Sequence, residues 1–214
     1  MRRSVPNFED LIVRTDFGGR ELSEKEQRKA LAVYDLWMQR LTRFASETCL
    51  CEGDLIRLTF AEIDEARGVV RPAGGRKKTS GAQISPLTAK AQTVLNEIKA
   101  GLRSGAIVAN VNGRVFTLDD GKPVTKGLIN YQVEKAVQAG VAKFRFHDLR
   151  HTTLTRWARE KIHVDVAMVA AGHSSVQMHQ KYLHLQDKDI AAAFDCGQNV
   201  VTRNVTRRRV ARRK

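Results

Sequence analysis

Apolar residues recur along most of the chain at the three- and four-residue spacing of amphipathic helices. The first helix is expected to begin at Ser23, because Ser23 and Glu26 have the spacing of a capping box. One long helical pattern follows, with apolar positions at Leu31, Tyr34, Leu36, Trp37, Met38 and Leu41. Further helices are expected over residues 52–58, 88–102, 128–139, 146–158, 164–171 and 174–183. Gly140 and Gly172 stand where two of these helices would end.

The segment from residue 63 to residue 87 does not follow this spacing. Val69 and Val70 predict a short strand, and residues 83–85 predict a strand that returns beside it. Glycines between the two strands indicate turns, and the tip of this hairpin is basic, with Arg76, Lys77 and Lys78. The predicted fold class is therefore α+β, mostly helical, with a small antiparallel β-sheet or hairpin.

A chain of 214 residues, 42% of them hydrophobic, is long and apolar enough to bury one core of ordinary size. Residues 1–20 are expected to form an irregular lead-in, residues 21–199 the folded domain, and residues 200–214 a basic, disordered tail. No apolar run approaches the length that spans a membrane, and no apolar signal core follows the first arginines.

The chain carries a net charge of +14, half of it in the last twelve residues, which contain no acid. The cations of this tail are Arg203, Arg207, Arg208, Arg209, Arg212, Arg213 and Lys214. The rest of the chain remains basic, which favours a polyanionic partner; the alternative is a soluble protein whose high pI has no binding role. Three cysteines, two of them in a CxC spacing, support neither a disulfide framework nor a zinc site and indicate reduced thiols in the cytoplasm.

The segment from Phe146 to Thr152, FHDLRHT, contains the residue types that phosphate chemistry needs. His147 and Arg150 lie three residues apart, on one face of the first turn of the expected helix, where free backbone N–H groups would also favour an anion. An arginine there can bind a phosphate oxygen, and a histidine can donate a hydrogen bond or move a proton. His147 and His151 also have metal-ligand spacing, but no third ligand accompanies them, so we expect no metal. Taken alone, the segment is equally well explained as an ordinary polar helix start.

Two more motifs follow. His173 lies between two expected helices, in a tight turn that would fix its backbone, although local capping explains a histidine there equally well. Tyr182 comes nine residues later; a phenol can attack phosphorus if its proton is removed, but a tyrosine near a helix end is more often half-buried packing. Lys78 at the hairpin tip suits a general acid, with a solvated basic turn as the plain alternative.

Together, HxxRH, then GHSS, then this tyrosine resemble the C-terminal motifs of the tyrosine recombinase (phage integrase) family. The upstream segments GDLIRL, FAEID and KTSG with SPL resemble, in order, the family's helix, turn and hairpin with its catalytic lysine. The resemblance spans residues 21–185. It implies the family's catalytic domain and transesterification through a 3′-phosphotyrosine, with no metal or nucleotide cofactor.

By this resemblance Tyr182 is the nucleophile, Lys78 the acid on the leaving 5′-oxygen, and Arg150 the group that stabilises the transition state. His147 and His173 assist proton transfer and bind the phosphate. The partner is double-stranded DNA, on which the protein is expected to act as a homo-oligomer, with Arg76, Lys77 and the basic tail as further DNA contacts.

Two features depart from the family pattern. The family's first catalytic arginine aligns with Cys51, and a thiol cannot replace a bidentate cation. About twenty residues precede the first helix, too few for the core-binding domain that family members usually carry. The leading expectation is site-specific recombination, integration or excision; the alternative is a catalytically impaired or silent DNA-binding relative that occupies or regulates recombination sites. A relaxing activity like that of type IB topoisomerases fits the motifs less well.

Overall fold

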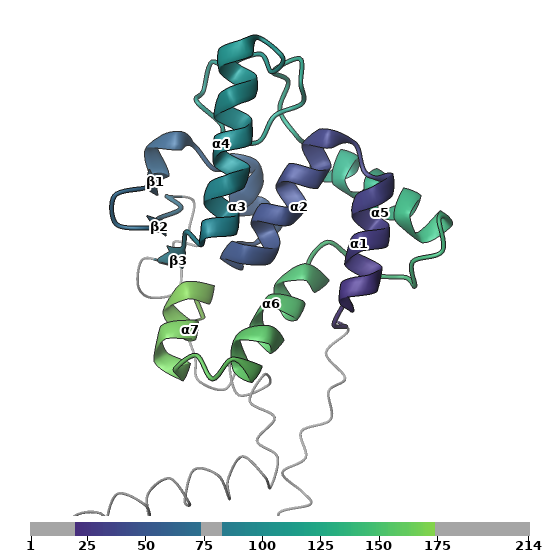
Figure 1. Cartoon of the computed structure of the whole chain (residues 1–214), viewed down its shortest axis with the longest axis vertical. Coiled ribbons are helices and arrows are strands. Elements are labelled where there is room, and N and C mark those ends of the chain that lie inside the picture. Colours follow the sequence, from purple (N-terminus) through teal and green to yellow (C-terminus); the bar gives the residue numbers. More distant parts are fainter. Residues whose placement is uncertain (1–19, 74–82, 174–214) are drawn as a thin grey trace, which may run out of the picture. The chain divides into compact units, whose positions relative to one another are not determined.

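A computed structural model gives the fold of this chain and describes residues 20–73 and 83–173 (Figure 1). The helices in these two ranges are α1 (Glu24–Val33), α2 (Leu36–Thr48), α3 (Glu52–Arg57), α4 (Ala89–Ser104), α5 (Lys126–Gln138), α6 (Asp148–Arg159) and α7 (Val164–Ala171). A short 3₁₀ helix, Phe60–Glu62, follows α3, and the strands are β1 (Ile63–Asp64), β2 (Val69–Val70) and β3 (Ser85–Pro86). The expected α+β class, mostly helical, is confirmed.

The small sheet is antiparallel and has the order β1-β2-β3. Val70 occupies its centre, paired with Ile63 on one side and with Ser85 on the other. Val70 and Ser85 are completely buried, so this short sheet is anchored in the core by its middle strand. The predicted antiparallel pairing of the two strands is therefore confirmed, although the returning strand begins at Ser85, two residues later than expected.

The single long helix expected after Ser23 is wrong, because the structure divides it into α1 and α2. Tyr34 and Asp35 both have extended backbone, with ψ near 150°, and Asp35 is the N-cap of α2. Contacts with α5 hold this break open: the Asp35 N–H donates to Gln132 Oε1 at 3.2 Å, and the Asp35 carboxylate accepts from Gln132 and Lys135. A tertiary contact thus overrides the local helical pattern.

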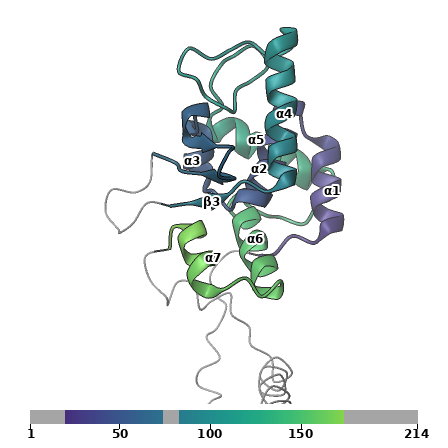
Figure 2. The ribbon, with the colours of Figure 1, turned by 60° about the vertical axis from the view of Figure 1, so that its left-hand side comes forward.

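Helix α2 lies at the centre of the fold, between α4 and α6 (Figures 1 and 2). Its buried side chains include Trp37, Met38, Leu41 and Phe44, and the Phe44 ring meets Phe116 edge to face at 5.2 Å. A second, smaller cluster of buried side chains comes mostly from α6 and α7. It consists of Cys49, Leu154, Trp157, Ala167, Ala170 and Ala171. The end of α2 therefore lies at the boundary between the main core and this second cluster.

Several predicted helix ends are confirmed. Ser23 and Glu26 form the capping box of α1, with bonds in both directions. Gly140 and Gly172 have φ of 86° and 64°, and each closes the end of its helix with hydrogen bonds back to the last turn. Among the helices of the described residues, none combines the length and the hydropathy needed to cross a bilayer.

Candidate active site

The candidate site begins at the turn that ends α2. Cys49 adopts a left-handed conformation with φ of 58°, and its N–H closes the last turn on Ala45 O at 3.1 Å. Its side chain is completely buried in the second cluster, which compensates for a conformation that a non-glycine residue adopts at a cost of about 1–2 kcal/mol. The turn leaves the Cys49 carbonyl available to α6 and leads directly to Cys51 and α3.

Three residues on one face of α6 bind the end of α2. Arg150 Nη1 donates to Cys49 O at 2.6 Å, while Thr153 Oγ1 and Arg156 Nη2 both donate to Ser46 O, at 3.0 and 2.8 Å. These residues are three apart, so they form a row along the helix. Because the last carbonyls of a helix have no partner within it, this row satisfies the end of α2 and fixes α6 against it.

Arg150 also binds the end of α7. Its Nη2 donates to Ala171 O, and the two carbonyls before it are bound by the segment that leads into β3. Ser85 Oγ and the Gln83 side chain donate to Ala170 O, and the Ile84 N–H donates to Val169 O. The Arg150 guanidinium thus bridges the C-terminal ends of two helices, where carbonyl dipoles favour a cation.

These two anchors use two of the five N–H donors of the guanidinium, and the described residues offer no hydrogen-bond partner to the others. The side chain is only partly buried, so these donors are within reach of a ligand. A planar cation held in a fixed orientation is the arrangement that binds two oxygens of a phosphate. The geometry therefore suits Arg150 to hold a phosphate diester.

The free N–H groups expected in the first turn of α6 are not present. The N–H groups of Asp148, Leu149 and Arg150 donate to the carbonyls of Arg145, Phe146 and His147, at 2.9 to 3.1 Å. A turn that precedes the helix thus uses them, and the buried Asp148 carboxylate accepts from the Arg145 N–H at 2.8 Å. Any anion at this end of α6 must be bound by side chains rather than by the backbone.

His147 is the N-cap residue of α6, and its ring lies edge to face against His151, with centroids 5.0 Å apart. Loss of water around the ring lowers the pKa of His147 to about 4, and the charges of His151 and Arg150 add to this shift. His147 is therefore neutral near pH 7 and can either accept or donate a proton. In the described ranges no group of three potential ligands forms a metal site around this pair.

His173 directly follows Gly172, at the end of α7. Its N–H donates to Met168 O at 3.0 Å, which places it in a Schellman motif, as the expected tight turn requires. Ala171, whose carbonyl binds Arg150, is two residues earlier in the chain. His173 therefore lies at the C-terminal end of α7, the helix end to which Arg150 binds. His147 lies at the start of α6.

Cys51 lies at the N-cap of α3, and its thiol donates to Asp54 Oδ2 at 2.7 Å. Burial raises the pKa of Cys51, and the hydrogen bond to Asp54 and that carboxylate's charge raise it further, whereas the Arg150 charge opposes the shift. The thiol is therefore neutral at pH 7. Asp54, which is 8% exposed, is a site residue that the sequence analysis did not single out.

Of the expected site residues, His147, Arg150, His173 and Cys51 are within the described ranges and gather around the ends of α2, α6 and α7. The remaining candidates are outside those ranges, so their roles stay predictions. They are Tyr182, Lys78, Lys77, Arg76 and the cations of the tail from Arg203 to Lys214.

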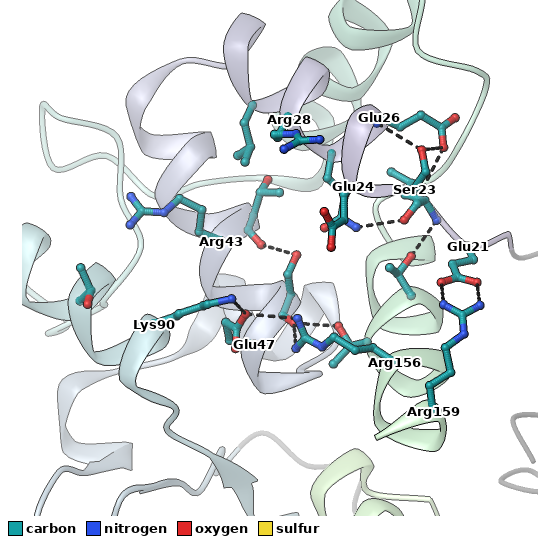
Figure 3. A pocket seen from close by; sticks show the side chains of 18 residues that line it. Glu21, Ser23, Glu24, Glu26, Arg28, Arg43, Glu47, Lys90, Arg156 and Arg159 are labelled. Carbon is teal, nitrogen blue, oxygen red and sulfur yellow. Dashed lines mark hydrogen bonds and ion pairs between the residues drawn. The ribbon is translucent and has the colours of Figure 1, made fainter. Parts of the chain in front are cut away.

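A cavity of about 850 Å³ lies between α1, α2, α4 and α6 (Figure 3). Two ion pairs join residues that line it: Arg159 faces Glu21, and Arg156 reaches Glu47 at 3.3 Å. Of the candidate site residues that the structure describes, none lines this cavity. Its ion pairs connect α6 to α2 and to the segment before α1, so they support the helix that carries Arg150.

Comparison with known proteins finds relatives among phage integrases and tyrosine recombinases. The chain is 27% identical to the integrase of Salmonella phage P22 over 155 residues, and 24% identical to the tyrosine recombinase XerC of Pseudomonas fluorescens over 153 residues. These matches cover 69% and 71% of this chain but 39% and 49% of the relatives, so the chain spans less than half the length of either.

The fold also resembles that of the Tn1549 transposon integrase, solved in complex with circular intermediate DNA. The TM-score is 0.65 at 18% identity, and the match covers 88% of this chain and 68% of that one. The sequence profile of the phage integrase family matches residues 20–189. This range is most of the chain and includes every candidate site residue that the structure describes. This chain belongs to the phage integrase family.

Proposed function

We propose that this chain is the catalytic domain of a site-specific recombinase that breaks and rejoins DNA strands. The observation that carries the proposal is Arg150, whose guanidinium is fixed on Cys49 O and Ala171 O, with His147 and His173 on the adjoining helix ends. A cation fixed in this way beside two histidines suits the binding of a phosphate. The P22 integrase and XerC, which share the family, are named for the same class of reaction.

The proposed reaction is a transesterification at a phosphate diester. The Tyr182 oxygen attacks phosphorus, the bond to the 5′-oxygen breaks, and Lys78 gives that oxygen a proton. The products are a 3′-phosphotyrosine and a free 5′-hydroxyl, which can later reverse the step. The proton of the Tyr182 hydroxyl passes to one of the two histidines. Arg150 stabilises the charge that develops on the phosphate, and the neutral His147, together with His173, binds its oxygens or moves protons.

Double-stranded DNA is the proposed partner, since the net charge of +14 favours a polyanion and the Tn1549 integrase was solved with DNA. Arg76, Lys77 and the basic tail are further proposed contacts. Exchange of strands between two duplexes needs more than one active site, so we expect the chain to act as a homo-oligomer on DNA. The proposed location of this reaction is the cytoplasm.

The test is capture of a covalent complex. The protein is incubated with a library of nicked suicide duplexes that carry a randomised core, and adducts are isolated on a denaturing gel and sequenced. We expect adducts that map to Tyr182 and that Tyr182→Phe abolishes without loss of non-covalent binding. Linkage through Tyr34 or Tyr131 would contradict the assignment of the nucleophile.

A second candidate function follows from Cys51. Its neutral thiol stands where the family pattern has an arginine, and loss of one such donor lowers rates by about 10²–10³. A chain that binds recombination sites but cleaves them slowly or not at all would give specific DNA binding without an adduct. The same library, analysed for non-covalent as well as covalent capture, separates the two functions.

A further inference from the structure

A hydrogen-bond acceptor, the Asp54 carboxylate, lies beside the Cys51 thiol. Asp54 Oδ2 accepts from Cys51 at 2.7 Å, and the other oxygen, Oδ1, faces Arg57 Nη2 at 3.4 Å. The Asp54 carboxylate thus contacts both the uncharged Cys51 thiol and the positively charged Arg57 guanidinium. The guanidinium of Arg57 is separated from the Cys51 thiol by a single carboxylate.

Arg57 is positioned by its helix. Side chains in a helix point back toward its start, so Arg57 in the last turn of α3 lies over the first turn. A Cβ at Gly53 would be 3.6 Å from Arg57 Nη2 and 3.8 Å from Nη1, which are ordinary contact distances, so the Arg57 guanidinium lies against the first turn of α3 at Gly53. Arg57 is held there loosely, since its side chain is 58% exposed and it has one long contact with Asp54.

Such a contact is easily exchanged for a phosphate, because an exposed ion pair contributes little to stability. Asp54 would keep a partner after the exchange, since Cys51 continues to donate to its other oxygen. The arrangement therefore lets Arg57 leave Asp54 without stranding a buried carboxylate.

Another cation near the end of α2 is engaged elsewhere. Arg43 makes two hydrogen bonds with Glu97 of α4, at 2.8 and 2.9 Å, and so is fixed on the face of α2 that packs against α4. Arg150 Nη1 donates to the carbonyl of Cys49, two residues before Cys51, so position 51 adjoins the Arg150 site. Arg57 is the cation that shares a carboxylate with this position.

We propose that Arg57 supplies the cation that position 51 lacks: its guanidinium, which lies beside Cys51 on Asp54, exchanges that contact for the phosphate diester and binds it together with Arg150. Arg57 is then a catalytic residue of this chain. It lies at the end of α3, whereas position 51 lies at the start of that helix. The inference rests on the proposed function, since it assigns a second cation to the same cleavage reaction.

The experiment measures single-turnover adduct formation on a duplex recovered from the library, at saturating protein and fixed salt. Arg57→Ala is compared with Arg67→Ala, a matched control in which an exposed arginine pairs with an aspartate three residues earlier, Asp64. Arg57→Ala should slow the adduct by about tenfold or more, whereas Arg67→Ala should change the rate less than twofold. Duplex affinity should fall by a similar small factor in both variants, because each loses one cation.

A second pair of variants tests whether the two positions do the same work. Cys51→Arg should restore the rate in the Arg57→Ala background and raise it much less in the wild-type background. Equal rates for Arg57→Ala and Arg67→Ala would overturn the role of Arg57 and leave the proposed function intact. An adduct seen with Cys51→Arg but not with the wild-type chain would overturn it too and favour the silent relative. No adduct with either protein, while DNA is bound, would overturn the proposed function itself.

Discussion

Replacing Arg150 by alanine should destabilise the fold as well as remove the proposed phosphate-binding group. The substitution deletes two hydrogen bonds from a charged donor, one to Cys49 O and one to Ala171 O. Bonds to charged groups contribute about 1.5–3 kcal/mol each, and water can replace part of them because Arg150 is only partly buried. We therefore expect a loss of about 2–4 kcal/mol in the free energy of unfolding, which lowers Tm by about 5–15 °C.

The matched control is Arg159→Ala on the same helix. Arg159 binds Glu21 with its Nη2 2.6 Å from Oε2, but its side chain is 65% exposed. An exposed pair contributes about 0–1 kcal/mol, so this variant should unfold close to the wild-type temperature. Both arginines lose the same charge, so the comparison isolates the two carbonyl anchors from the change in net charge.

The assay is urea unfolding followed by circular dichroism, supported by thermal melts at the same pH and salt. Arg150→Lys should fall between the wild type and Arg150→Ala, because an ammonium can keep one carbonyl but not span both helix ends. If Arg150→Ala unfolds with the same midpoint as Arg159→Ala, the guanidinium does not join α2 to α7, and the basis for its fixed orientation is lost.

Three further perturbations test other parts of the argument. Because the pKa of His147 is about 4 in the fold and 6.5 in the unfolded chain, stability should fall as the pH drops from about 6.5 toward 4; urea unfolding across that range should show a shallower fall for His147→Gln. Gly172→Ala should cost more stability than Gly113→Ala in the same assay: both glycines have φ near 64°, but only at Gly172 would a Cβ meet Gln83, 3.0 Å from its Oε1. Deletion of residues 203–214 should weaken binding to non-specific duplex and make its salt dependence shallower, and an unchanged slope would exclude the tail as a contact.

The helix ends were predictable because their signals are local. The capping box at Ser23 and the glycines at positions 140 and 172 act within one turn of their own helix, so the sequence alone predicts them. The break at Asp35 was not predictable, because it depends on Gln132 and Lys135, about a hundred residues away. Local pattern therefore predicts where helices end but not where a distant contact interrupts them.

The candidate site divides in the same way. The motif spacing identifies His147 and Arg150, but backbone carbonyls hold Arg150, and no side-chain pattern marks them. The free N–H groups expected at the start of α6 are used by the preceding turn, whose conformation the sequence does not specify. The Cys51 contact with Asp54 has a local signal, since an N-cap residue and its third neighbour commonly bond, and a search for that spacing finds it.

The two carbonyls that hold Arg150 also affect how fast and how tightly a phosphate can bind. A free arginine side chain samples many rotamers, and ordering it on a ligand costs up to about 2 kcal/mol of entropy. Here the fold itself supplies that ordering, because Cys49 O and Ala171 O hold the guanidinium in one orientation. Encounter with a duplex then requires no search over Arg150 conformers, so a phosphate that reaches this part of the site is bound without a slow rearrangement of the side chain.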